Sequence, residues 1–203
     1  MTTTYGFKAM NADMTCRDYQ FEIGKTYQIN NEKPLKLCSD SGFHFCLNFE
    51  DVFNYYGCIS SRVFKIKTES EVLTKGSQSI TKEISILEEV TIEEINLKES
   101  KNKYTKLFVI NKITDENLVF DTFKDDKDWE VREAVVQKLS DKKLIYDTFK
   151  DDKKWFVREA VVKKLSDEKL IFDTFKDDED PYVRKVVVNK LSDEQLIYSF
   201  KDD

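Results

Sequence analysis

The chain has 203 residues, with 33 basic and 39 acidic side chains and a formal net charge of −6. Its 40% apolar residues are enough for a hydrophobic core and too many for an intrinsically disordered protein. No apolar run reaches the roughly 18–20 residues of a membrane helix, and residues 1–14 lack the basic start and apolar centre of a secretion signal. We therefore expect a cytoplasmic protein without a membrane partner. The acidic balance disfavours a general nucleic-acid coat protein.

The composition divides the chain into two parts. All five glycines lie within residues 1–76 and all four cysteines within residues 1–58. Residues 1–112 carry 15 basic and 15 acidic groups, whereas residues 113–203 carry 18 basic and 24 acidic groups. Because glycine marks turns and its absence favours helices, we expect a small α+β domain over residues 1–95. A linker or connecting helix follows over 96–103, and helical repeats follow over 104–203.

Short β-rich runs, separated by turn signals such as Gly24 and Gly57, characterise the first part. They predict strands over residues 5–9, 19–23, 26–29, 43–47, 63–67 and 80–87. Residues 50–56 predict a short helix with Asn48 as its cap, and residues 91–97 predict another. The expected product is a domain of mixed class.

The one histidine, His44, stands two residues before Cys46, and side chains at this spacing share one face of a strand. Together with Cys38 they are candidates for a zinc site, but the Cys-x2-Cys pair of strong zinc signatures is missing. A Cys–His nucleophile is a further alternative. The favoured interpretation is that the cysteines are small buried apolar groups in a reducing cytosol. We therefore expect neither a metal nor a cofactor.

The second part repeats every 26 residues. Leu-Ser-Asp recurs at residues 139–141, 165–167 and 191–193, and Val-Arg recurs at 131–132, 157–158 and 183–184. This period predicts stacked units of two short helices that bury a continuous core. The serines of the first motif are the expected N-caps, at Ser140, Ser166 and Ser192. A degenerate helix is expected over residues 104–112.

An aspartate stands five residues before each Val-Arg pair, at Asp126, Asp152 and Asp178. This pattern resembles the short HEAT-like repeats that include the leucine-rich repeat variant. The resemblance implies an all-α HEAT-like solenoid over the second part. It also implies that the arginines tie adjacent turns together as a structural ladder, formed by Arg132, Arg158 and Arg184.

Trp129 and Trp155 occupy equivalent positions before the second helix of their units, and Pro181 replaces them in the last unit. They either cover the corner between helices or anchor a protein partner. The Lys-Asp-Asp tracts supply acidic candidates for a partner surface, namely Asp151, Asp152, Asp177 and Asp178. An acidic surface favours a partner with a basic surface. Recurring lysine pairs (142–143, 153–154 and 163–164) leave direct nucleic-acid binding as a disfavoured alternative.

The first part carries a second resemblance, through the stretches YGFKAMN, TCR and GFHFC. They are similar to an uncharacterised domain common in bacteriophage and prophage proteins. The matching positions include Lys8, Asn11, Arg17, Gly24, Tyr27, Cys38, His44, Cys46, Tyr55 and Tyr56. The resemblance implies an accessory protein of a phage or mobile element, acting in the host cytoplasm. Its most concrete form is an anti-CRISPR-like inhibitor that binds a basic, nucleic-acid-handling defence complex.

The order of the expected elements also resembles that of ADP-ribosyltransferase folds. An early Tyr-Gly-Phe strand is followed by the Gly-Phe-His-Phe-Cys strand, a helix and a late strand rich in glutamate. The resemblance implies that Glu83 or Glu88 would support transfer from NAD. An enzyme, or an inactive relative, is therefore the alternative to a binding protein. We assign no catalytic residue and favour protein binding.

Overall fold

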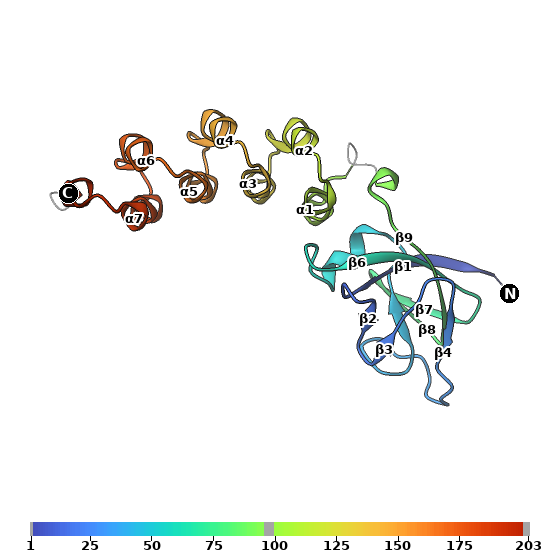
Figure 1. Ribbon diagram of the computed structural model, residues 1–203. Coiled ribbons are helices and arrows are strands. Elements are labelled where there is room, and N and C mark those ends of the chain that lie inside the picture. Colours follow the sequence, from blue (N-terminus) through green and yellow to red (C-terminus); the bar gives the residue numbers. More distant parts are fainter. Residues whose placement is uncertain (1, 96–99, 201–203) are drawn as a thin grey trace. The chain divides into compact units, whose positions relative to one another are not determined.

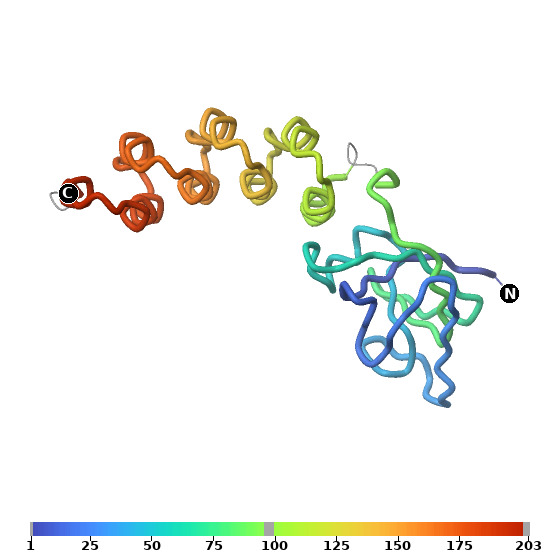
Figure 2. The backbone as a smooth tube through the Cα atoms, viewed as in Figure 1, coloured from blue at the N-terminus to red at the C-terminus, as the bar shows by residue number. Residues whose placement is uncertain are grey.

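The computed structural model describes residues 2–95 and 100–200, and the chain forms two compact units, residues 1–108 and 109–203 (Figures 1 and 2). The first unit is mostly β-sheet and the second is helical. No helix in the described ranges is long and apolar enough to cross a membrane.

Among the described residues of the first unit, the strands form three antiparallel sheets. The largest has the strand order β1-β6-β9-β4 and consists of β1 (Thr4–Met10), β6 (Arg62–Thr68), β9 (Glu83–Glu89) and β4 (Thr26–Gln28). The second pairs β2 (Thr15–Cys16) with β3 (Tyr19–Gln20). The third has the order β5-β8-β7 and consists of β5 (Phe43–Phe45), β8 (Gln78–Thr81) and β7 (Val72–Lys75).

The apolar core of this unit joins its sheets. Strands β1, β5, β6 and β9 and the loops beside β2 and β3 all contribute to one buried cluster, which includes Met10, Phe21, Phe43, Phe45, Phe64, Ile66, Ile84 and Ile86. Strand β1 also contacts β5 directly, through a bridge between Phe7 and Cys46. Gly6 permits this approach, because a Cβ there would lie 2.6 Å from the carbonyl oxygen of Cys46.

The strand predicted over 80–87 is divided between β8 and β9. Lys82 stands between them, and its ammonium donates to the backbone carbonyls of Asn31 and Lys33. Strand β7 was not predicted. It forms a hairpin with β8 through Gly76, whose φ of 61° suits glycine.

The two helices predicted in the first part are short 3-10 helices. The first is η1 (Glu50–Asn54), and its N-cap is Phe49, while Asn48 donates to the Asp51 carboxylate instead. The second is η2 (Ile92–Glu94); residues 96 and 97 of the predicted range lie outside the described residues.

The boundary between the units falls later than the predicted one, inside α1 (Lys103–Lys112). The ring of Phe108 packs against Phe49 and Phe53, with centroid separations of 5.8 and 5.4 Å. These contacts assign the start of α1 to the first unit. Of the predicted connecting segment 96–103, residues 96–99 lie outside the described residues.

The second unit is built from pairs of short helices that follow the 26-residue period. They are α2 (Glu116–Phe123), α3 (Trp129–Lys138), α4 (Lys142–Phe149), α5 (Trp155–Lys164), α6 (Glu168–Phe175), α7 (Pro181–Lys190) and α8 (Glu194–Tyr198). Figure 1 shows α3, α5 and α7 in one row and α2, α4 and α6 in another, and α3 contacts α5 as α5 contacts α7. The equivalent side chains Val131, Val157 and Val183 are fully buried, as expected for units that cover one another's apolar faces.

The N-caps of the first helix in each unit are aspartates, which corrects the predicted serine caps. The carboxylates of Asp141, Asp167 and Asp193 accept bonds from backbone N–H groups in the first turn. The serines before them bind the neighbouring unit: Ser140 donates to Glu116, and Ser192 donates to Glu168. Each helix therefore begins one residue later than predicted, because its serine links units instead of capping the helix.

Candidate functional site

Arginines at the 26-residue period join successive units in the second part of the chain. Arg132 donates from Nε and Nη2 to the two carboxylate oxygens of Asp152, at 2.6 and 2.9 Å, and from Nη1 to the carbonyl of Asp126. Arg158 makes the same bidentate contact with the carboxylate of Asp178, at 2.8 and 2.7 Å. Each arginine thus holds the aspartate of the following unit through a planar charged pair.

These pairs remove two residues from the predicted partner surface. The side chains of Asp152 and Asp178 are only 8% and 6% exposed. Burial alone would raise the pKa of Asp152, but the hydrogen bonds from Arg132 and from the Lys154 amide outweigh it, and the pKa is lowered. Both aspartates belong to the ladder, and neither is available to a partner.

Arg184 is the third predicted member of the ladder. It donates to the carbonyls of Asp178 and Glu179, and no carboxylate within the described residues pairs with it. Its contacts therefore stay within its own unit.

The other aspartate of each Lys-Asp-Asp tract faces outward. Asp125, Asp151 and Asp177 recur at the 26-residue period in the turns before α3, α5 and α7, and all three are exposed. The side chains of Asp151 and Asp177 are 82% and 75% exposed, and each lies near the lysine that precedes it. We call these three residues the acidic row.

The same turns lead into a stack of aromatic rings at the start of α3, α5 and α7. The ring of Phe156 lies 4.3 Å from Trp129 and 3.6 Å from Trp155, with interplanar angles of 16° and 24°. Trp155 stacks in turn on Tyr182, at 5.0 Å and 19°. The tryptophans and Phe156 are half-buried, and Tyr182 is 60% exposed. We call these four residues the aromatic stack.

Sequence reasoning found half of the aromatic stack. Trp129 and Trp155 were candidates, whereas Phe156 and Tyr182 were missed. Alignment of the units by their 26-residue period would have shown them. The position that follows Trp129, Trp155 and Pro181 is occupied by Glu130, Phe156 and Tyr182. In the last unit the tyrosine of this second position replaces the tryptophan that Pro181 displaces.

The lysine pairs are largely engaged within the second unit. Four of these lysines have partners, in the pairs Lys142–Ser166, Lys143–Asp147, Lys163–Glu159 and Lys164–Gln137. The remaining pair, Lys153 and Lys154, is exposed. This arrangement gives little support to a continuous basic stripe for nucleic acid.

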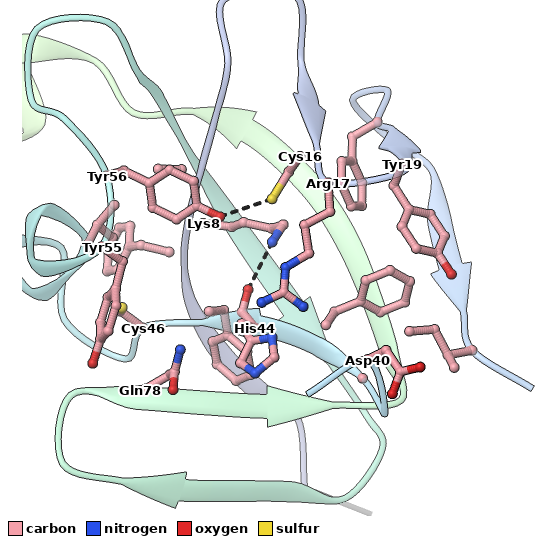
Figure 3. A pocket seen from close by; sticks show the side chains of 18 of the residues that line it. Lys8, Cys16, Arg17, Tyr19, Asp40, His44, Cys46, Tyr55, Tyr56 and Gln78 are labelled. Carbon is pink, nitrogen blue, oxygen red and sulfur yellow. Dashed lines mark hydrogen bonds between the residues drawn. The ribbon is translucent and has the colours of Figure 1, made fainter. Parts of the chain in front are cut away.

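The first unit contains a cavity of about 740 Å³ at the meeting point of β1, the β2–β3 turn and β5 (Figure 3). The ammonium of Lys8 lies in it and donates to the carbonyl of His44 at 3.0 Å. The thiol of Cys16 lies 2.9 Å from the hydroxyl of Tyr56. Arg17 reaches into the same cavity from the turn (Figure 3).

His44 and Cys46 do not form an activated nucleophile. Burial, followed by the charges of Arg17 and Lys8, lowers the pKa of His44 to about 4. Burial raises the pKa of Cys46 to about 11. A thiol that keeps its proton is a poor nucleophile, and a histidine this acidic is a weak base for activating it.

The metal and transferase candidates are not brought together either. His44 Nε2 accepts the backbone N–H of Cys38 at 3.0 Å, and no three His, Cys, Asp or Glu side chains cluster as metal ligands in the described ranges. Glu83 accepts a bond from Gln28, and Glu88 pairs with Lys65. Neither glutamate lines the cavity.

Comparison with known proteins concerns the first unit. Residues 4–99, a little under half of the chain, are similar to a domain of unknown function (DUF7666). No curated protein matches the chain. No solved structure matches it either. The repeats of the second unit lie outside the matched stretch.

Proposed function

We propose that this chain is a protein-binding accessory protein whose partner has a basic surface. The second unit is, in this account, a HEAT-like solenoid that binds through the aromatic stack and the acidic row. The observation that carries the proposal is that both features recur at the 26-residue period in the same turns, so that each added unit extends one surface.

The aromatic stack suits a protein partner better than a nucleic acid. Single-stranded nucleic acids bind by stacking bases on the faces of aromatic rings. Here the faces of Trp155 and Phe156 are covered by neighbouring rings. The stack offers partly exposed aromatic side chains that are already held by their neighbours, and tryptophan and tyrosine are enriched at the centres of protein interfaces.

The acidic row would make the surface selective for partners of positive charge. Its carboxylates are exposed and the second part carries the whole net charge of −6. Complementary charges raise the rate of association and disfavour acidic competitors. A protein that handles nucleic acid presents the basic surface that such a row would attract.

The resemblance to phage and prophage domains supplies the cellular setting of the proposal. In that setting the partner is a host protein in the cytoplasm, most concretely a nucleic-acid-handling defence complex of the CRISPR type. The chain would inhibit it by occupying its basic surface.

The test is affinity capture from host lysate with matched charge variants. Replacing the acidic row (Asp125→Asn, Asp151→Asn and Asp177→Asn) is expected to remove the captured basic protein. The control replaces three exposed aspartates of the same period on α2, α4 and α6 (Asp121→Asn, Asp147→Asn and Asp173→Asn), and it should leave capture unchanged. Equal loss in both variants would reduce the effect to net charge, and capture unaffected by either variant would refute the proposed surface.

A further inference from the structure

Lys8 is a buried cation without an acidic partner. Its side chain lies in the first unit with only 4% of the residue exposed, and no carboxylate in the described ranges lies within ion-pair distance of it. Its ammonium donates to the carbonyl of His44, also forms a side-chain hydrogen bond with Cys16, and lies 5.5 Å from the centre of the Phe21 ring. Lysine is almost never buried to this degree unless it is paired, since an uncompensated buried charge is costly.

A second cation lies at the same cavity. Arg17 lines it from the β2–β3 turn, and one of its nitrogens donates to the carbonyl of Ser39 at 3.2 Å. Its backbone has a φ of 53°, which is uncommon for a residue other than glycine. Figure 3 shows the guanidinium directed into the space beside His44. Burial lowers the pKa of both Lys8 and His44, and the charge of Arg17 adds to each shift.

No acid among the described residues pairs with Lys8, although Asp40 lies near Arg17: the hydrogen bond from Lys33 lowers the pKa of Asp40, and the charge of Arg17 contributes. Asp18 and Asp40 also line it, and both are exposed. The carboxylate of Asp40 is bound by Lys33 at 2.7 Å. The most deeply buried basic group of the cavity is therefore Lys8, whose pKa is lowered by burial.

The walls around the cations are aromatic. Tyr19, Phe21 and Phe43 form one group, with ring centroids 5.0 to 6.0 Å apart. Tyr55 and Tyr56 line another side. The lining of the cavity is about equally polar and apolar, and its volume of about 740 Å³ is within the usual size range of small-molecule sites.

We propose that this cavity binds a small organic anion, whose carboxylate or phosphate oxygens contact Lys8 and Arg17 and whose flat apolar body packs on the aromatic walls. The bound anion supplies the counter-charge that the protein itself does not give Lys8. The site is separate from the partner surface of the second unit and does not depend on it.

Phenyl phosphate and benzoate are suitable probes, because each joins an anionic group to a flat ring. Each probe is titrated into the full chain while the NMR resonances of the His44 imidazole are recorded. At least one of the probes is expected to show saturable binding. Binding should be about tenfold tighter than that of inorganic phosphate or of phenol, which carry the separate halves of the ligand. The tighter of the two probes identifies the anionic group.

Lys8→Met should weaken binding about tenfold or more, and Lys75→Met, which changes an exposed lysine of β7 outside the cavity, should not. Arg17→Gln changes an exposed side chain, so it is a second variant in which weaker binding is expected if Lys8→Met does not fold. Absence of saturable binding by either probe would overturn the proposal. So would equal binding of inorganic phosphate and phenyl phosphate, or affinity that none of the cavity variants alters.

Discussion

At the scale of single residues, His44 reports the charge of the cavity. It is the one histidine of the chain, so its imidazole resonances are assigned without ambiguity. Burial and the nearby charges of Arg17 and Lys8 disfavour its protonated form. Its place in the first unit thus makes it a direct test of the described electrostatics.

An NMR titration of His44 is expected to give a midpoint near pH 4 in place of the ordinary 6.5. Arg17→Gln should raise this midpoint, because it removes one of the two charges. Since the folded pKa lies below the unfolded one, the contribution of His44 to the free energy of unfolding is complete above about pH 6.5 and is lost as the pH falls toward 4. A midpoint near 6.5 would contradict the burial and charges described here.

At the scale of elements, the arginine ladder joins α3 to the turn before α5, and α5 to the turn before α7. Arg158→Met leaves the Asp178 carboxylate buried without its partner and is expected to lower the free energy of unfolding by about 3–5 kcal/mol. Arg184→Met removes contacts to backbone carbonyls alone and should cost less, about 1–2 kcal/mol. Denaturant unfolding measures both changes. Equal losses in the two variants would show that the charged pair between units does not stabilise the fold more than hydrogen bonds to backbone carbonyls do.

Because of the ladder, the free energy of unfolding is also expected to depend on pH in the acidic range. The lowered pKa of Asp152 means that its pair with Arg132 stabilises the fold fully above the ordinary aspartate value of 3.8, and that this stabilisation is lost as the pH falls below it.

The period made the pairing of helices predictable, because burial recurs with it at positions such as Val131 and Val157. It did not separate the two aspartates of each Lys-Asp-Asp tract. Asp151 faces solvent and Asp152 binds Arg132, and this difference depends on how adjacent units meet. The serine caps failed for the same reason, since Ser140 binds Glu116 of the unit before it.

At the scale of the molecule, two units with different chemistry share one chain. The first, with 14 basic and 15 acidic side chains over residues 1–108, is nearly neutral on a mostly β fold and holds two basic side chains at an aromatic cavity. The second concentrates negative charge on helical repeats. Lys8, Arg17 and His44 all belong to the stretches that carry the domain resemblance, but the sequence did not show that they share a cavity. The bridge between Phe7 and Cys46 and the β2–β3 turn bring them together. Repetition is visible in a sequence, whereas a site assembled from distant strands is not.

The central claim is that the chain binds a basic protein through the aromatic stack and the acidic row. Photo-crosslinking from single positions tests it most directly. A photoreactive residue replaces Tyr182, which is 60% exposed in the stack, or Leu118, which is 52% exposed on α2. The account predicts an adduct with a basic host protein from position 182, suppressed by raised salt, and none from position 118. Adducts of equal yield from both positions, or from neither, would contradict it.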